Sequence, residues 1–319
     1  MYQQLEPLDL KSCRLALITN GGAGKKDAHR NGLIVHDTLR PLVQDLREIP
    51  VRNGAMITQV ARQAIAEGFD VVAGLGGDGT QAAIANAVTN SGAAMAVLPG
   101  GTFNYFAREL GLDTMEKALA AISSGQILAR DVGQVNDRIF LNNASLGLYP
   151  KILDTREDIY HRWGRSRFAA YWSVLVGLRD LYRPMRLTVR SQGLSRDYVT
   201  HLAFVARSAF QLESLGLEGA EAVRAGKFVL FIAKAQSRGG LVGGSMRLAL
   251  GRVARGDDFE LVVGDDVVLE TGHMKRKVAL DGEQGPMTMP LNLRVLPNAL
   301  RIVAPAIENK PVDLAGKVA

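Results

Sequence analysis

Short apolar runs alternate with amphipathic segments along the first 130 residues. The apolar runs predict strands, and aliphatic residues recur near helical spacing in the segments between them. Expected strands lie at 14–19, 48–51, 69–73 and 94–98, and expected helices at 27–46, 55–67, 81–88 and 105–110. This alternation predicts an α/β domain in which a parallel sheet carries helices on both faces. Ligands of such sheets bind at the carboxyl ends of the strands.

The pattern changes near residue 130, after which short strands predominate. Expected strands lie at 131–135, 139–142, 185–190, 198–206, 228–235, 258–263, 267–271 and 277–280, with one helical segment at 151–182. Short strands joined by turns favour an antiparallel arrangement. We therefore expect two domains, an α/β domain at residues 1–130 and an antiparallel, β-rich domain at residues 131–319.

Three of the expected strands end in glycine-rich turns, at residues 20–26, 74–80 and 99–104. Glycine allows the chain to turn sharply and to approach a ligand that a β-carbon would repel. Where a helix follows, its first N–H groups and its dipole add a binding site for phosphate. One such turn is also common in ordinary loops, but three strands that each end in a glycine turn indicate a phosphate-binding edge of the sheet.

The first two turns carry side chains with recognisable chemistry. Thr80 is placed either to cap the next helix or to bond a phosphate oxygen. Asp78 would repel phosphate unless it holds Mg²⁺, a water molecule or the proton of a nucleophile. In the first turn, Lys25 or Lys26 is available as a charged arm that contacts phosphate.

A fourth motif, from Leu280 to Gly285, combines two carboxylates with a glycine turn. Asp281 and Glu283 flank Gly282, so both are expected to face one cleft. A hydroxyl that attacks phosphorus needs a carboxylate to orient it and to accept its proton. A tight turn with exposed acids is the alternative interpretation.

The 319 residues carry a formal net charge of +6. This charge favours an anionic partner such as a nucleotide, a nucleic acid or an acidic membrane surface. In the segment 151–182 arginines are interleaved with aromatic residues, which suits anionic lipid head groups and equally a solvated helix with one buried face. No recognised nucleic-acid-binding signature accompanies these charges, so we expect no nucleic-acid partner.

Other features of the sequence bear on location. Cys13 is the single cysteine, which excludes an internal disulfide and favours a reducing compartment. The N-terminal residues lack the basic and apolar regions of a signal peptide, and no apolar run approaches the ~20 residues that span a bilayer. Any contact with a membrane is therefore expected to be peripheral.

Taken in this order, the three glycine turns and the Asp-Gly-Glu motif resemble the diacylglycerol kinase catalytic domain family, whose superfamily also contains sphingosine kinases and NAD kinases. Bacterial lipid kinases look most similar. The resemblance implies a two-domain enzyme that binds ATP with Mg²⁺ between its domains and transfers the γ-phosphoryl group to a hydroxyl of a diacylglycerol-like membrane lipid. It also implies a cytoplasmic protein that works at the inner face of the membrane, with a hydrophobic cleft for acyl chains in the β-rich domain.

The resemblance assigns roles to individual residues. Glu283 would accept the proton of the lipid hydroxyl, Asp78 would organise Mg²⁺ or the attacking group, and Asp281 would support the site. The residues expected to hold the nucleotide are Asn20, Gly24, Lys25, Gly76, Gly77, Asp78, Gly79, Thr80 and Thr102.

This sequence departs from the family pattern at two places. Tyr105 follows Asn104 where many members have aspartate, which puts a metal-linked role of that acid in doubt. Ala225 begins a stretch where some members hold a structural Mg²⁺ with an Asp-Gly turn, so we expect no second metal there. In relatives the C-terminal segment, here from about residue 291, folds back on the first domain, and the sequence leaves this point open.

Other functions remain open. A sphingoid base or ceramide kinase would use the same phosphoryl-transfer residues on a different hydroxyl. An NAD kinase would share the Gly-Gly-Asp-Gly turn, but the Gly-Thr-Phe-Asn turn and the Asp-Gly-Glu motif argue against it. A lipid-sensing module that keeps the nucleotide fold without turnover is the non-enzymatic alternative.

Overall fold

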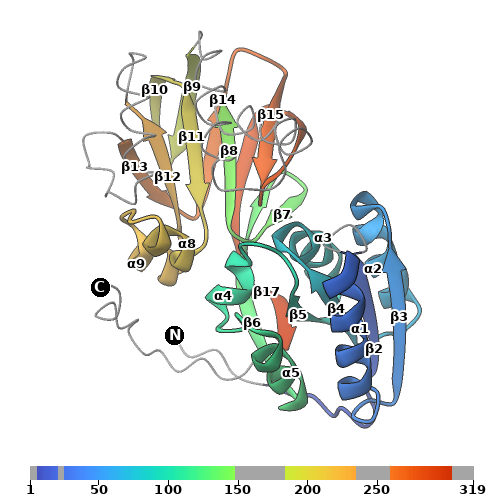
Figure 1. The fold of residues 1–319 in the computed structure, drawn as a ribbon. Coiled ribbons are helices and arrows are strands. Elements are labelled where there is room, and N and C mark those ends of the chain that lie inside the picture. The colour runs from blue at the N-terminus through green and yellow to red at the C-terminus, as the bar shows by residue number, and fades with distance from the viewer. Residues whose placement is uncertain (1–5, 21–24, 148–183, 235–258, 304–319) are drawn as a thin grey trace.

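The computed structural model describes residues 6–20, 25–147, 184–234 and 259–303 (Figure 1). Strands and helices alternate in the first half of the described chain, and strands predominate in the second half. The first-half elements are β1 (Glu6–Pro7), β2 (Arg14–Asn20), α1 (Lys25–Leu39), β3 (Asp45–Val51), the 3₁₀ helix η1 (Gly54–Met56), α2 (Ile57–Ala66), β4 (Val71–Gly76), α3 (Asp78–Val88), β5 (Ala94–Pro99), α4 (Tyr105–Glu109) and α5 (Met115–Ser123).

The chain then continues mainly as strands. These later elements are β6 (Gln126–Val135), β7 (Arg138–Phe140), β8 (Asn143–Gly147), β9 (Met185–Ser191), β10 (Leu194–Thr200), β11 (Leu202–Ala206), α8 (Ala209–Ser214), α9 (Ala220–Arg224), β12 (Phe228–Ala233), β13 (Phe259–Gly264), β14 (Asp266–Glu270), β15 (Lys275–Leu280), β16 (Glu283–Thr288) and β17 (Leu291–Val303). The described structure thus has an α/β part followed by an antiparallel, β-rich part, as the sequence predicts.

The α/β domain is built on parallel strands in the order β17-β5-β4-β2-β3. Every residue of β4 is buried, which explains why this strand is continuously apolar rather than alternating. Helices α2 and α3 contact each other, as do α1 and α5, and the two pairs cover the sheet from its two faces. Because β2, β4 and β5 are parallel neighbours, their carboxyl ends, and with them the second and third glycine turns, lie along one edge of the sheet. Residues 21–24 of the first turn lie outside the described residues.

The β-rich part consists of two layers around a second core. One layer is a six-stranded sheet in the order β13-β12-β11-β8-β15-β16, and the other is formed by β10, β9 and β14 with parts of β6 and β17. Apolar side chains alternate along these strands and meet between the layers, where Phe140, Phe228 and Leu230 are buried completely. Helices α8 and α9 cover the outer face of the six-stranded sheet near β11 and β12.

Strand β17 connects the two parts. Its first residues pair with β14 and with the second half of β6, and its last residues pair with the first half of β6 and with β5. Strand β6 itself crosses residue 130, where the sequence predicts a domain boundary, so the division at that residue stays a prediction. The sheet of the α/β part is thereby continuous with one layer of the β-rich part through β17 and β6.

Three expected elements in the α/β domain have clearly different bounds. The helix expected at 27–46 ends at Leu39, because Pro41 cannot continue a helix and disfavours helical backbone at the residue before it. The strand that follows begins at Asp45 and contains Pro50, which is tolerated because β3 is the edge strand of the sheet. The strand expected at 69–73 is β4, which continues to Gly76.

Further differences concern the β-rich part. The strand expected at 198–206 is two strands, because the chain passes from β10 in one sheet to β11 in the other at His201. Strands β8, β16 and β17 were not expected as strands: β8 begins with a polar residue and ends in glycine, β16 contains a Gly-Pro pair, and β17 contains a proline. The helical segment expected at 151–182 lies outside the described residues.

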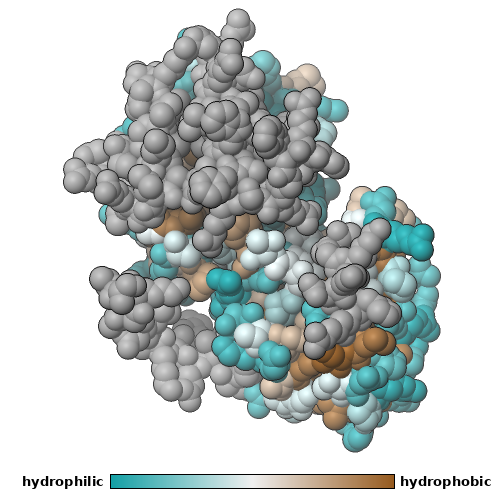
Figure 2. Space-filling model, in the orientation of Figure 1, coloured by the Kyte–Doolittle hydropathy of each residue, from teal (hydrophilic) through white to brown (hydrophobic). Residues whose placement is uncertain are grey.

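On the face shown in Figure 2, the described surface carries many hydrophilic residues and an apolar patch over α1. Leu33 and Ile34 contribute to exposed apolar area on that helix. Cys13 is buried, and burial raises the pKa of its thiol to about 12, which makes it unreactive at neutral pH. Within the described ranges, no helix combines the length and apolar character needed to cross a membrane.

Candidate active site

The second and third glycine turns pack directly against each other. The N–H of Gly100 donates to the carbonyl of Gly76 at 2.9 Å, and a β-carbon on Gly77 would lie 3.2 Å from the Cα of Gly101. A β-carbon on Gly101 would overlap the Cα of Gly77. Two backbones share this space, so only glycine fits, and the two turns form one surface at the carboxyl edge of the sheet.

The residues Asp78, Gly79 and Thr80 form the first turn of α3, and Gly77 is the N-cap. The expectation that Thr80 caps this helix is therefore wrong, because Gly77 already holds the capping position. Thr80 is buried instead, and its Oγ1 atom accepts a hydrogen bond of 3.2 Å from Asn20 Nδ2. This bond joins the end of β2 to the second turn.

The carboxylate of Asp78 is fixed through one of its oxygens. Its Oδ1 atom accepts hydrogen bonds from the backbone N–H of Phe106 at 3.1 Å and from Asn142 Nδ2 at 3.4 Å. The Oδ2 atom has no partner among the described residues. Asp78 thus links the second turn to α4 and to the segment before β8, and it keeps one oxygen for a ligand.

Asp281 is buried and faces the backbone rather than an open cleft. Its carboxylate accepts hydrogen bonds from the N–H groups of Leu141 at 2.7 Å, Asn142 at 2.7 Å and Asn143 at 3.0 Å. Burial raises the pKa of Asp281 to about 7; the three N–H donors oppose this shift, and the charge of Asp78 adds to it. Asp281 therefore holds in place the segment that carries Asn142, whose side chain contacts Asp78.

Glu283 begins β16, directly after the two-residue turn of Asp281 and Gly282, both of which have positive φ. The residue as a whole is exposed, but its carboxylate lies against the start of α3. Its Oε1 atom is 2.7 Å from the position that a β-carbon would take on Gly79. Burial raises the pKa of Glu283, and the charge of Arg138 lowers it. A carboxylate from the far end of the chain thus lies beside the second glycine turn.

The third turn is closed by Asn104, which has left-handed backbone conformation with φ of 51°. Its side chain accepts a hydrogen bond from the N–H of Gly101 and donates one to the Gly101 carbonyl, each at 2.9 Å. Phe103 and Tyr105 stack with parallel rings, 5.6 Å between centroids. Tyr105, where many family members have aspartate, therefore extends an aromatic pair at this turn.

The other predicted site residues are placed as follows. Gly76 is buried beneath Thr80, and a side chain at this position would collide with it. Thr102 is exposed in the third turn. Lys25 starts α1, and Gly24 lies outside the described residues, so their expected contacts with a nucleotide stay predictions.

Two residues that sequence reasoning missed also shape the site. Asn142 makes the contact with Asp78 and is almost completely buried. Gln81 is buried under the second turn, where its Nε2 atom donates to the carbonyls of Gly74 at 2.9 Å and Gly76 at 3.3 Å. In the sequence, both are polar residues next to apolar ones, which could have indicated buried polar side chains. Gln81 lies in an alanine-rich helix, and Asn142 lies at the end of an apolar run.

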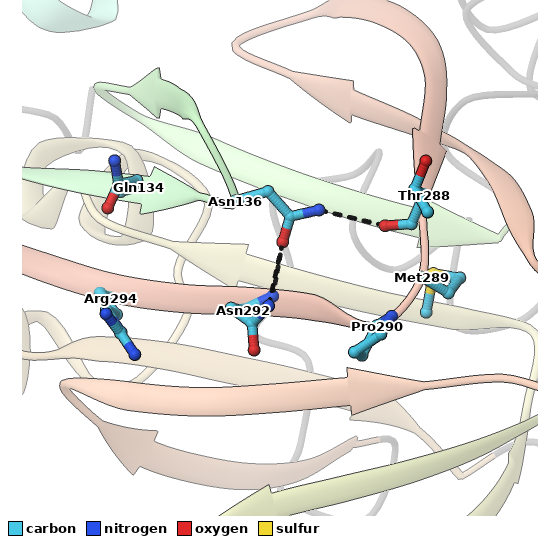
Figure 3. A pocket seen from close by; sticks show the side chains of 7 residues that line it. All are labelled: Gln134, Asn136, Thr288, Met289, Pro290, Asn292 and Arg294. Atoms are coloured by element: carbon cyan, nitrogen blue, oxygen red, sulfur yellow. Dashed lines mark hydrogen bonds between the residues drawn. The ribbon is translucent and has the colours of Figure 1, made fainter.

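A polar pocket lies away from these turns, between the β6–β7 turn and the start of β17 (Figure 3). It is lined by Gln134, Asn136, Thr288, Met289, Pro290, Asn292 and Arg294. None of these residues was predicted to take part in the site. Elsewhere, the part of the chain that the structure describes contains no group of three or more His, Cys, Asp or Glu side chains suited to hold a metal ion.

Comparison with known proteins gives matches over part of the chain. The family model of the diacylglycerol kinase catalytic domain matches residues 14–135. A protein of Pseudomonas aeruginosa (strain UCBPP-PA14), named probable lipid kinase YegS-like, is 36% identical over 119 residues, which are 35% of this chain and 39% of that protein. A diacylglycerol kinase of Bacillus subtilis (strain 168) is 35% identical over 94 residues, 28% of this chain and 31% of that protein. The chain thus spans about a third of the length of these curated relatives.

The fold has a counterpart over nearly its whole length. A crystal structure of a diacylglycerol kinase from Bacillus anthracis str. Sterne superimposes with a TM-score of 0.68, covering 92% of this chain and 97% of that one at 20% identity. At this identity the likeness concerns the fold alone. Residues 14–135, which include the three glycine turns, thus match the diacylglycerol kinase catalytic domain family, and the fold as a whole resembles that of a solved diacylglycerol kinase.

Proposed function

We propose that this protein is a lipid kinase that transfers the γ-phosphoryl group of ATP to a hydroxyl of a membrane lipid, with diacylglycerol as the expected class of acceptor. One observation carries the proposal: the Glu283 carboxylate lies against Gly79 in the second glycine turn. A proton acceptor and a phosphate-binding helix start therefore meet, although they come from opposite ends of the sequence. The match of residues 14–135 to the diacylglycerol kinase catalytic domain supports the same reaction class.

The glycine turns fit a triphosphate. Backbones at Gly77 and Gly101 approach so closely that side chains are excluded, and the N–H groups at the start of α3 face the edge of the sheet. Asp78 fits Mg²⁺, because a carboxylate oxygen without a described partner suits this cation, which binds one or two carboxylates together with substrate phosphates. When bound, Mg²⁺ would neutralise charge on the phosphates.

The reaction assigns Glu283 as the general base. Its carboxylate accepts the proton of the lipid hydroxyl while that oxygen bonds to the γ-phosphorus, and the bond between this phosphorus and the bridging oxygen of ADP breaks. Burial raises the pKa of Glu283, which strengthens it as a base. Asp281 acts indirectly, because it fixes the backbone of Asn142 and thereby the orientation of Asp78.

The experiment supplies purified protein with radiolabelled ATP, Mg²⁺ and a panel of diacylglycerol, ceramide and sphingosine in mixed micelles. We expect a labelled, chloroform-soluble product, and the acceptor that yields it identifies the lipid class. Glu283→Gln should reduce kcat by roughly 10²- to 10⁴-fold while ATP affinity is retained. Glu270→Gln is the control, since Glu270 forms an exposed ion pair with Arg190 in the same part of the protein.

Other outcomes would replace the proposal. A labelled, water-soluble dinucleotide formed from NAD would indicate an NAD kinase. Binding of ATP and lipid without turnover of any acceptor would indicate a lipid-sensing module. Full activity of Glu283→Gln would remove Glu283 as the base.

We also propose that the protein works on the cytoplasmic face of the membrane, held peripherally by anionic lipids. The net charge of +6 supports this, since anionic surfaces attract basic proteins. Sedimentation with vesicles tests it. Binding should increase with the fraction of anionic lipid and decrease with salt, and equal binding to neutral vesicles would contradict it.

A further inference from the structure

Arg138, the first residue of β7, is carried by a hairpin that is anchored at its turn. Asn136 in this turn has positive φ, its Nδ2 donates to the carbonyl of Thr288 at 3.0 Å, and its Oδ1 accepts from the N–H of Asn292 at 2.9 Å (Figure 3). Thr288 ends β16, the strand that Glu283 begins. The hairpin is therefore fixed relative to the strand of the proposed base.

The residues after Arg138 are anchored as well. Asn86 of α3 forms two hydrogen bonds with the backbone of Ile139, one with its N–H at 2.8 Å and one with its carbonyl at 3.0 Å. Asp281 then binds the N–H of Leu141. The backbone of β7 is thus held between the helix that follows the second glycine turn and the turn that precedes Glu283.

This anchoring places the Arg138 guanidinium over β16. Its Nη1 atom lies 3.9 Å from the position of a β-carbon on Gly285. Side chains two residues apart on a strand share a face, so Gly285 and Glu283 face the same side of β16. Because Gly285 has no side chain, the guanidinium lies along the face from which the Glu283 carboxylate projects.

The charge of Arg138 is available for a ligand. Arg138 is exposed, and the ion pairs among the described residues engage other arginines, such as Arg130, Arg207 and Arg294, but not this one. The charge of Arg138 lowers the pKa of Glu283, although burial of Glu283 has the larger, opposite effect. The two side chains therefore interact electrostatically without forming an ion pair. A guanidinium fork binds phosphate oxygens in pairs.

We propose that Arg138 binds an oxyanion beside Glu283, namely the phosphoryl group in transfer or a phosphate in the head group of the acceptor lipid. The inference rests on the proposed function. The carboxylates of Asp78 and Glu283 both lie near the reacting groups, and a phosphoryl group adds further negative charge there. A fixed cation at this point lowers the free energy of the transferring state.

The test compares Arg138→Ala, Arg138→Lys and the control Arg186→Ala, which removes an exposed arginine from β9. Calorimetry measures the affinities for ATP and ADP, and kinetics are measured with diacylglycerol and with phosphatidylglycerol as acceptors. If the ligand is the transferred phosphoryl group, Arg138→Ala should lower kcat roughly 100-fold with every acceptor that is used. It should also lower the affinity for ATP but leave the affinity for ADP unchanged. Arg138→Lys should recover part of the loss.

If the ligand is instead a head-group phosphate, the loss should be confined to phosphatidylglycerol and appear in KM, with ATP and ADP affinities unchanged. In either case Arg138→Ala should move the acidic limb of the pH profile upward, because Glu283 loses a neighbouring positive charge. The inference would be overturned if Arg138→Ala and the control Arg186→Ala had the same rates, the same pH profile and the same ratio of ATP to ADP affinity. Absence of lipid turnover by the unmodified protein would remove the proposed function, while the ATP-to-ADP ratio would still decide whether Arg138 binds the terminal phosphate.

Discussion

The Oε1 atom of Glu283 lies 2.7 Å from the point where a β-carbon would sit on Gly79. This contact exists only because the β15–β16 turn of the β-rich part reaches the first turn of α3 in the α/β domain. Neither residue indicates this contact in the sequence, where Glu283 simply follows a glycine and Gly79 simply precedes a threonine. In the proposed reaction, an acceptor hydroxyl and the terminal phosphate of ATP would meet beside this pair.

Gly79→Ala tests this contact directly. The new β-carbon would displace the Glu283 carboxylate, whereas the helix itself tolerates alanine well. We expect kcat to fall at least 10-fold and the melting temperature to change little. Gly272→Ala is the matched control, because a β-carbon at Gly272 meets no atom within 4 Å. Unchanged kcat in Gly79→Ala would show that the position of the Glu283 carboxylate does not limit the reaction.

The pH dependence of kcat/KM should reflect Glu283. A base must be ionised to accept a proton, so activity should fall as the pH drops through its pKa. Since burial raises the pKa of Glu283, we expect the acidic limb above the ordinary range of a glutamate. A profile that is flat down to the ordinary glutamate pKa would contradict the role of Glu283 as the titrating base.

Asp281→Asn should destabilise the fold in a pH-dependent manner. The folded-state pKa of about 7 lies above the ordinary aspartate pKa of 3.8, so the folded state binds the proton more tightly. The contribution of Asp281 is therefore fully present below about pH 4 and is lost as the pH rises through about 7. The stability difference between wild type and Asp281→Asn, measured by urea unfolding, should shrink over this interval, by at most about 1.4 kcal/mol per pH unit.

The control for this experiment is Asp137→Asn, since Asp137 is exposed in the β6–β7 turn. Its stability difference from wild type should be small at every pH. A difference for Asp281→Asn that grows between pH 4 and pH 7 would mean that the three N–H donors, rather than burial, dominate the pKa of Asp281.

Glu109→Ala should weaken the junction between the two parts of the protein. Glu109 ends α4, and its Oε2 atom accepts hydrogen bonds from Ser208 Oγ at 2.6 Å and from the N–H of Phe210 at 2.8 Å, at the start of α8. Loss of this partner leaves two donors unsatisfied, so the free energy of unfolding should fall by roughly 1–3 kcal/mol. Glu221→Ala, which removes an exposed partner of Arg224, is the control and should lower the free energy of unfolding by less than about 1 kcal/mol.

The sequence predicts the α/β domain well because its signals are local. Strands β2, β4 and β5 are buried apolar runs that end in glycine turns, and each turn marks the same edge of the sheet. The α1 helix was expected too long because the aliphatic spacing continues past Pro41, although proline ends the helix. The spacing of aliphatic residues alone does not show where a proline ends a helix.

The β-rich part and the supporting contacts of the site were harder to predict. Strand β17 contains Pro297 and a bulge between Leu296 and Leu300, so its sequence lacks a regular alternation, and its partners are distant in sequence. Asn142 and Arg138 acquire their roles only through contacts made by Asp281, Asn136 and Asn86. Such contacts depend on tertiary structure, so no regular spacing of residues in the sequence indicates them.

Strand β17 has a consequence for biosynthesis. The ribosome completes β5 and β6 long before residues 291–303 emerge, and until then both strands have an unpaired edge. An exposed edge of this kind readily joins another chain. Most of the α/β domain is therefore synthesised early, but its sheet is completed only by the last described strand, so the edges of β5 and β6 stay open to other chains until residues 291–303 have emerged.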